Sequence, residues 1–326
     1  METNISFSDY MSQVINVLKQ EERYGTAYIY EYALRALRKF RRAENIPFTV
    51  FSKTEMKRFE LHLQNLRRSW NTISTYFRAL RAVYNRAVDT EIVKGECRLF
   101  HNVFTGVTSE KKLALEACEM QALVTSEGRN AKATTINASQ GLMKARHLLS
   151  LMLLLQGIGF ADLIHLRCED LKKNGFNEHM LHFRRQKTGT ELSIRVTPEA
   201  MKIINLYRSH GNSPYLLDML DGESRGEVAY KEYRQLLRNF NYHLARLGTL
   251  CSINTRVSSY TARHTWATLA KYCEVPEEVI SEGLGHSSLE VTRTYLKRFK
   301  SDKLDKAYRI IIDYIMKGKQ NLWGSL

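Results

Sequence analysis

Two stretches organise this sequence: VSSYTARHTWAT at residues 257–268 and LGHSSLEVTRTY at residues 284–295. The first places Arg263 and His264 at the opening of a predicted helix. The second places His286 at a turn between two predicted helices and Tyr295 nine residues further along. Guanidinium and imidazole groups can donate hydrogen bonds to phosphate, and a tyrosine hydroxyl can act as a nucleophile. The two stretches therefore predict a site that binds a phosphate and attacks it.

The length and charge of the chain limit the classes of function. With 326 residues it is long enough for two domains with well-buried cores. The 49 lysines and arginines outnumber the 34 acidic residues and give a net charge of +15. A basic excess that is scattered along the chain favours a polyanionic partner such as nucleic acid, although ribosomal and membrane-surface proteins share the trait.

The cysteines and apolar runs exclude several other classes. The five cysteines are widely spaced and form no Cys-x-x-Cys pair, which argues against a zinc site and against a disulfide framework. The most apolar run, residues 148–155, is too short to span a bilayer, and the N-terminal residues lack a secretory pattern. We therefore expect a protein of the reducing cytoplasm that needs no membrane, metal or cofactor.

The first segment, from Phe7 to Val103, has the pattern of four helices with apolar stripes and basic opposite faces. Arginines and short polar residues cluster around the start of the fourth helix, where backbone N–H groups also favour phosphate. An ordinary solvated basic face is the alternative interpretation. The residues that we expect to contact DNA here are Arg67, Arg68, Asn71, Thr72, Thr75, Arg78 and Arg81.

Residues 104–115 are polar and lightly basic, with a glycine, which is typical of a linker between domains. Lys111 and Lys112 could lie along a phosphate backbone and let two domains close around a duplex. The sequence thus predicts a DNA-binding domain over residues 1–103, a linker over 104–115 and a second domain over 116–326.

The second domain is predicted to be mostly helical with one hairpin. Helices are expected over residues 116–127, 144–156, 231–247, 260–272, 276–282 and 289–297, with a glycine-rich turn from Gly157 into a short helix. Residues 180–196 alternate apolar and polar side chains around a Lys-Thr-Gly-Thr turn, which indicates a β-hairpin. Period-two alternation places Arg185 and Lys187 on the same side of its first arm.

Four motifs of the second domain resemble the catalytic domain of the tyrosine recombinases, also called the phage integrase family. They are the Gly-x-x-x-x-Asp-Leu turn at Gly157, the Lys187-Thr-Gly hairpin, the Arg263-His264 box, and Leu-Gly-His286 with Tyr295 at the family spacing. The N-terminal helices resemble the core-binding domain of the family. The resemblance implies a mainly α fold, with a four-helix core-binding domain and a mostly helical catalytic domain that carries a small antiparallel sheet.

The resemblance also implies an activity and a role for each site residue. The enzyme would be a site-specific DNA recombinase that stores each broken strand as a 3′-phosphotyrosyl link on Tyr295. Arg263 would clamp the phosphate, and His286 would hydrogen-bond it. Lys187, at the hairpin tip, would protonate the departing 5′-oxygen.

Two positions depart from the family pattern. Gly159 stands where the family has an arginine, and Tyr260 stands where it usually has a histidine. Loss of one preorganised phosphate donor typically raises the barrier by roughly 3–4 kcal/mol. We expect Arg185, on the same hairpin side as Lys187, to supply the missing cation, with Arg184 and Arg146 as weaker candidates. Integrases and invertases of mobile elements from gut anaerobes look similar at these positions.

The last predicted helix follows the tyrosine. Residues 301–316 carry an apolar stripe at helical spacing, formed by Leu304, Tyr308, Ile311, Ile312 and Ile315. The resemblance implies that this helix docks on a neighbouring protomer, with two protomers on each duplex site and four in the synapse. Folding back on its own domain is equally open. The short segment before Phe7 favours a simple recombinase such as an invertase.

Three other interpretations fit parts of the sequence. A related topoisomerase would use the same tyrosine chemistry without a specific site. A non-catalytic DNA-binding regulator would have lost activity at Gly159 and Tyr260. A plain helix-turn-helix over residues 276–295 would leave Lys187 and Arg263 unexplained.

Overall fold

The computed structural model describes residues 5–96, 98–107, 113–125, 139–208, 213–286 and 288–297. The chain divides into two compact units. The first is Met1–Glu110 together with Ser224–Lys231, and the second is Lys111–Glu223 together with Glu232–Leu326. Each unit has its own cluster of buried apolar side chains.

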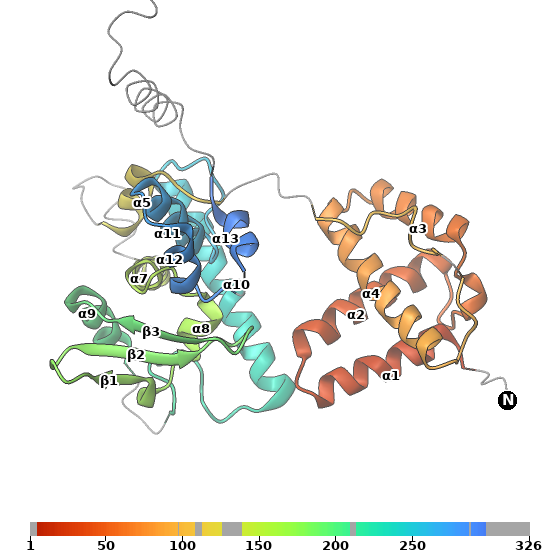
Figure 1. Ribbon diagram of the computed structural model, residues 1–326, viewed down its shortest axis with the longest axis horizontal. Coiled ribbons are helices and arrows are strands. Elements are labelled where there is room, and N and C mark those ends of the chain that lie inside the picture. The colour runs from red at the N-terminus through yellow and green to blue at the C-terminus, as the bar shows by residue number, and fades with distance from the viewer. Residues whose placement is uncertain are drawn as a thin grey trace, which may run out of the picture. The chain divides into compact units, whose positions relative to one another are not determined.

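Four helices build the first unit, as the sequence predicts: α1 (Phe7–Gln20), α2 (Tyr24–Arg41), α3 (Lys53–Asn65) and α4 (Trp70–Asp89) (Figure 1). Serines begin three of them, because the hydroxyls of Ser6, Ser52 and Ser69 each accept the backbone N–H three residues later. A short 3-10 helix, η1 (Phe48–Val50), precedes α3. The predicted apolar stripe of α4 is buried, with Ile73, Phe77 and Leu80 all 0% exposed.

Helices also dominate the second unit (Figure 1). They are α5 (Ala117–Val124), α7 (Gln140–Leu154), α8 (Phe160–Ile164), α9 (Pro198–Tyr207), α10 (Gly226–Leu250, which belongs to this unit from Glu232 onward), α11 (Thr261–Tyr272), α12 (Glu277–Gly283) and α13 (Leu289–Tyr295). The apolar helix α7 lies in the core, where Leu149, Leu151 and Met152 are fully buried. Its central place confirms what its composition predicts.

The second unit carries a small antiparallel sheet of three strands in the order β1 (Leu171–Lys173), β2 (His179–Arg184) and β3 (Glu191–Arg195). The predicted hairpin is the β2–β3 pair, with Leu181 opposite Ile194 and Arg184 opposite Glu191. β1 was not expected, because three residues with one half-buried leucine give too short a pattern to recognise. The sheet therefore confirms the hairpin and adds one strand.

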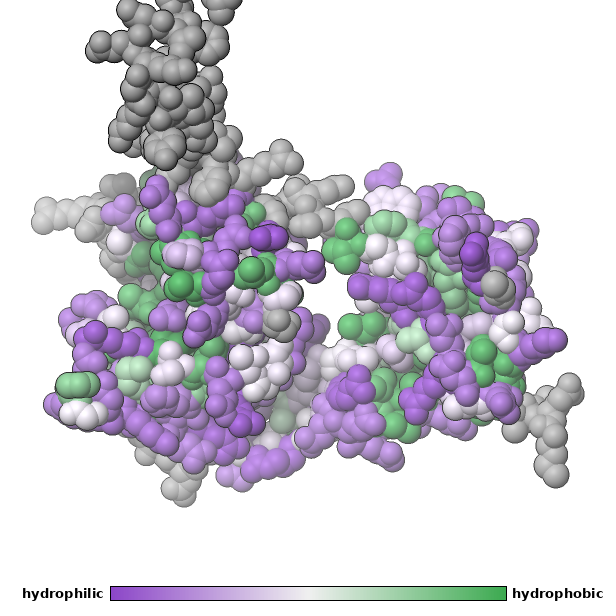
Figure 2. All heavy atoms as spheres, in the orientation of Figure 1, coloured by the Kyte–Doolittle hydropathy of each residue, from purple (hydrophilic) through white to green (hydrophobic). Residues whose placement is uncertain are grey.

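On the face drawn in Figure 2, hydrophilic residues cover most of each unit, and apolar side chains form smaller groups between them. None of the helices within the described residues is long and apolar enough to cross a membrane. The predicted linker residues Lys111 and Lys112 and the predicted helix over residues 301–316 lie outside the described part of the chain.

Two leucines of α3 test the core of the first unit. Leu63 is 2% exposed and Leu61 is 49% exposed. We expect Leu63→Ala to lower the free energy of unfolding by about 2–5 kcal/mol, because the lost side chain leaves a cavity. Leu61→Ala should change it by less than about 0.5 kcal/mol. Chemical denaturation of both variants measures the difference, and equal effects would contradict this packing.

Candidate active site

A cavity of about 350 Å³ in the second unit lies between α8, the β2–β3 hairpin, α10, α11 and the segment from His286 to Tyr295. All six residues predicted to be catalytic line it: Arg185, Lys187, Tyr260, Arg263, His286 and Tyr295. Gly159 and Asp162 line the same cavity. The structure thus brings together residues that lie more than a hundred positions apart in the sequence.

Arg263 lines the cavity and is only 4% exposed. Its Nη1 donates to the backbone oxygen of Gly157 at 3.1 Å, and its Nη2 donates to that of Leu284. Nη2 also lies 3.0 Å from Nε2 of His286. Within the described ranges, no carboxylate oxygen comes within 4.0 Å of this guanidinium, and its Nε has no hydrogen-bond partner.

The charge of Arg263 is therefore poorly balanced. Burial first, and then the charge of Arg185, lower the pKa of Arg263 below its ordinary value. A buried cation that neutral oxygens and an imidazole surround is unfavourable unless an anion joins it. The arrangement favours binding of an anion at this end of the cavity.

His286 connects Arg263 to α13. Its Nδ1 lies 2.8 Å from the hydroxyl oxygen of Thr292. Burial, followed by the charges of Arg263, Arg185 and Lys187, lowers the pKa of His286 to about 4. The imidazole is therefore neutral near pH 7 when no anion is bound.

Tyr295, the last residue of α13, lies between two imidazoles. Its ring centroid is 4.4 Å from that of His264 and 5.0 Å from that of His286, which stacks on it at 24°. The guanidinium carbon of Arg263 is 5.7 Å from the same centroid. The backbone oxygen of Tyr295 accepts a hydrogen bond from the Thr268 hydroxyl at 3.3 Å. These contacts hold Tyr295 in the cavity of its own chain.

Asp162 fixes the hairpin to α8. Its Oδ1 accepts the backbone N–H of Gln186 at 2.8 Å, and its Oδ2 lies 3.4 Å from Nε of Arg185. Arg185 also donates through Nη1 to the backbone oxygen of Gly285 at 2.8 Å. Two residues beyond Arg185, Lys187 is exposed and has no hydrogen bond or ion pair with other described residues.

Gly159 lies at the position where the resemblance implies an arginine. A Cβ atom at Gly159 would lie 3.1 Å from Oδ2 of Asp162. The Nε of Arg185 approaches this same oxygen. A side chain at residue 159 would therefore start next to the carboxylate that now holds the Arg185 guanidinium.

The structure does not bring the two weaker candidates into the cavity. The side chain of Arg184 is 73% exposed and pairs with Glu191. Arg146 is buried in α7 and does not line the cavity. Tyr260, in contrast, lines the cavity although 57% of its surface is exposed.

Two threonines that touch the site were missed by the sequence reasoning. Thr292 binds His286, and Thr268 holds the backbone of Tyr295. Thr292 lies three residues before Tyr295, so helical spacing places both on one face of α13 and could have identified it. Thr268 lies on α11 and gave no comparable signal in the sequence.

The first unit carries the residues that we expect to contact DNA. Arg67, Arg68, Asn71, Arg78 and Arg81 are exposed along the α3–α4 connection and α4, while Thr72 and Thr75 are half-buried beside them. The hydroxyl of Thr75 donates to the backbone oxygen of Asn71 at 2.7 Å. Five of these seven residues lie on α4, and Arg67 and Arg68 directly precede its N-cap, Ser69.

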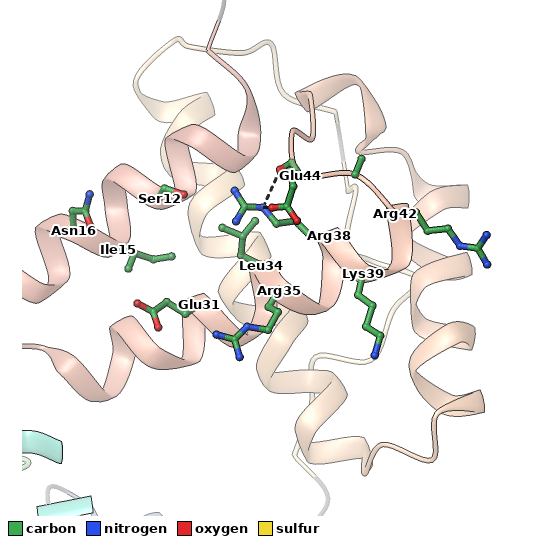
Figure 3. Close-up of a pocket in the computed structure, with 11 residues that line it drawn as sticks. Ser12, Ile15, Asn16, Glu31, Leu34, Arg35, Arg38, Lys39, Arg42 and Glu44 are labelled. Carbon is green, nitrogen blue, oxygen red and sulfur yellow. Dashed lines mark hydrogen bonds and ion pairs between the residues drawn. The ribbon is translucent and has the colours of Figure 1, made fainter. Parts of the chain in front are cut away.

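A second basic surface in this unit surrounds a hollow of about 760 Å³ between α1 and α2. Figure 3 shows Arg38 turned toward Glu44, to whose backbone oxygen its Nε donates at 2.9 Å. Arg35, Lys39 and Arg42 line the same hollow. Both α2 and α4 therefore present basic faces.

The low pKa of His286 predicts a pH dependence of stability. The folded pKa is about 4 and the ordinary value is 6.5, so the unfolded chain binds more protons between these values. Stability should fall as the pH falls through this window. We expect His286→Gln to reduce the loss of unfolding free energy between pH 7 and pH 5 by about 1–2 kcal/mol. Denaturant titrations at both pH values measure it, and an unchanged loss would contradict the buried neutral imidazole.

Comparisons with known proteins agree with this geometry. A model of the phage integrase SAM-like domain matches residues 6–102, and a model of the phage integrase family matches residues 129–302. A tyrosine recombinase of Pseudothermotoga lettingae is 28% identical over 156 residues, which are 48% of this chain. The match spans about half the length of that relative, 50%.

Solved structures show the same fold. The Tn1549 transposon integrase in complex with transposon right end DNA has a TM-score of 0.60 at 14% identity, over 94% of this chain and 100% of that one. The lambda integrase bound to DNA has a TM-score of 0.59 at 12% identity, over 87% and 94%. The predicted mainly α fold is confirmed. Because the catalytic-domain model covers more than half of its residues, the chain belongs to the phage integrase family.

Proposed function

We propose that this protein is a site-specific DNA recombinase that cuts and rejoins DNA through a 3′-phosphotyrosyl intermediate on Tyr295. The observation that carries the proposal is the buried Arg263 guanidinium, which has no carboxylate partner among the described residues and lies against the Tyr295 ring. A phosphodiester would supply the missing negative charge beside a nucleophile. Membership of the phage integrase family supports the same conclusion.

Each residue of the cavity has a proposed task. The Tyr295 oxygen attacks phosphorus, and the bond from phosphorus to the 5′-oxygen breaks. Arg263 and Arg185 stabilise the charge on the non-bridging oxygens. Lys187, exposed at the hairpin tip, gives its proton to the 5′-oxygen. His286 hydrogen-bonds the phosphate, and Tyr260 donates from the rim.

We propose that Arg185 replaces the arginine that Gly159 lacks. Its guanidinium is held by Asp162 and by the backbone of Gly285, so it is preorganised. The carboxylate that holds it is the one that a side chain at residue 159 would meet first. In the family pattern this arginine comes from the turn before α8. In this chain the cation would come from the β2–β3 hairpin.

We also propose double-stranded DNA as the partner. The exposed arginines around α4 and the basic linker would bind phosphates, with residues 1–103 as the DNA-binding domain and 116–326 as the catalytic domain. The Tn1549 and lambda integrases were solved on DNA, which supports this assignment. Two protomers on each site and four in the synapse, joined through residues 301–316, remain predictions. An integrase or invertase of a mobile element, acting in the cytoplasm, fits best.

One observation favours a second candidate, a non-catalytic DNA-binding regulator. Tyr260 is 57% exposed and stands where the family usually has a histidine, and Gly159 offers no side chain where the family has an arginine, so two positions depart from the family pattern. A topoisomerase-like enzyme would share the tyrosine chemistry without a specific target.

Covalent capture distinguishes the three functions. The wild-type protein and Tyr295→Phe would be incubated with fragmented genomic DNA of the source organism, quenched with detergent, and the protein-linked fragments sequenced. We expect adducts at one or a few sites with wild type and none with Tyr295→Phe. Adducts at scattered sequences would indicate a topoisomerase. Absence of adducts with wild type would contradict both enzyme proposals.

Two neighbouring arginines test the replacement proposal. We expect Arg185→Ala to lower the rate of adduct formation on a captured site by about 10²–10³-fold, because a phosphate donor is lost. Arg184→Ala, whose side chain points outward, should stay within about threefold of wild type. Thermal unfolding of both variants controls for folding. An Arg185→Ala variant as active as wild type would contradict the replacement.

A further inference from the structure

The two ring nitrogens of His286 face different kinds of group. Nε2 lies 3.0 Å from Nη2 of Arg263, which carries only N–H groups and can only donate. One N–H of Nη2 goes to the backbone oxygen of Leu284, and the other points to Nε2. Nε2 must therefore present its lone pair, and the proton of the neutral ring must be on Nδ1.

The Thr292 hydroxyl accepts the hydrogen bond from this Nδ1–H. Its hydroxyl oxygen is 2.8 Å from Nδ1, and the residue is 0% exposed. A threonine hydroxyl can accept and donate, so it can accept the Nδ1–H, and with this tautomer both ring nitrogens have a partner. Thr292 lies one turn before Tyr295 on α13, and it thereby ties the imidazole to the helix that ends in the proposed nucleophile.

We propose that Thr292 is a positioning residue that, together with Arg263, fixes the tautomer of His286, with the proton on Nδ1 and the lone pair of Nε2 toward Arg263. The catalytic consequence rests on the proposed function. When a phosphate oxygen takes the Nη2 hydrogen bond of Arg263, Nε2 loses its donor and can accept a proton from solvent. It then donates this proton to the phosphate in a hydrogen bond, while Nδ1–H stays on Thr292.

The groups around His286 favour a neutral imidazole before phosphate binds. Arg263 from α11, and Arg185 and Lys187 from the hairpin, are the charged groups that act on it, and the Tyr295 ring from α13 stacks on it. All three cations disfavour a charged imidazole until a phosphate is present. Thr292 keeps the ring orientation constant in both states, because Nδ1 is protonated in each.

Three variants separate this task from simple packing. Thr292→Val has nearly the same shape but lacks the hydroxyl, and Thr292→Ser keeps the hydroxyl. Thr294→Val is the matched control, since Thr294 is an exposed threonine of the same helix whose hydroxyl donates to the backbone oxygen of Val291 at 2.7 Å. Thermal unfolding checks that each variant folds.

Long-range ¹⁵N–¹H NMR of the full chain reads the tautomer directly, with His286→Gln used to assign the signals. Wild type, Thr292→Ser and Thr294→Val should show the neutral Nδ1–H form of His286 at pH 7. Thr292→Val leaves a buried Nδ1–H without an acceptor, so the ring should turn from its place against Arg263 and show a mixture of tautomers or the Nε2–H form. A Thr292→Val variant with the wild-type tautomer, or a wild type with Nε2–H, would overturn the inference.

The rate of adduct formation on a captured site gives a second measurement. Thr292→Val should be slower by roughly 10- to 100-fold, as for loss of a partner that orients an imidazole. Thr292→Ser and Thr294→Val should remain within about threefold of wild type. The NMR result does not depend on activity. A wild type without adducts would therefore contradict the proposed function, while an unchanged tautomer would contradict the inference alone.

Discussion

The second unit depends on one unfavourable interaction, the burial of the Arg263 guanidinium without a carboxylate beside it among the described residues. Three neutral acceptors hold it: the backbone oxygens of Gly157 and Leu284, and Nε2 of His286. These come from the turn before α8, the end of α12 and the turn before α13. Gly157 permits the close approach, because its φ is +70° and a Cβ there would lie 3.1 Å from Cα of Arg263.

The remaining site groups are arranged around this cation. Thr292 orients His286, and His286 and His264 enclose the Tyr295 ring. On the other side, Arg185 bridges Asp162 and the backbone of Gly285, which places the hairpin over the cavity. Two cations thus lie near each other around a space that has the size and charge for a phosphate. An uncompensated pair of this kind is costly for the free protein and useful for an enzyme that must stabilise a charged transition state.

Much of this architecture could be predicted from local patterns. Apolar stripes at helical spacing identified the four helices of the first unit, and alternation identified the β2–β3 hairpin. Alternation also places Arg184 and Arg185 on opposite sides of the strand, so the outward position of Arg184 could be predicted from the sequence. Motif positions and hairpin alternation selected six residues as one site, and these six line one cavity, while their tasks stay predictions.

Other features depend on tertiary packing and left no local signal. The short strand β1 forms because its backbone pairs with the edge of β2. Helix α10 begins at Gly226, five residues before its predicted start. The hydrogen bond from Thr268 to the backbone of Tyr295 joins residues 27 positions apart. The contact of Arg185 with Asp162 depends on how closely the hairpin packs against α8. The spacing of residues along the sequence does not show this.

The measurement that tests the buried cation most directly is the effect of inorganic phosphate on thermal unfolding. Wild type and Arg263→Gln would be compared in sodium phosphate and in sodium chloride at equal ionic strength and pH 7.5. The variant corrects for the general stabilisation that phosphate gives to folded proteins. If Arg263 binds an anion in the cavity, phosphate will raise the Tm of wild type more than that of Arg263→Gln. Equal increases in both proteins would contradict the account.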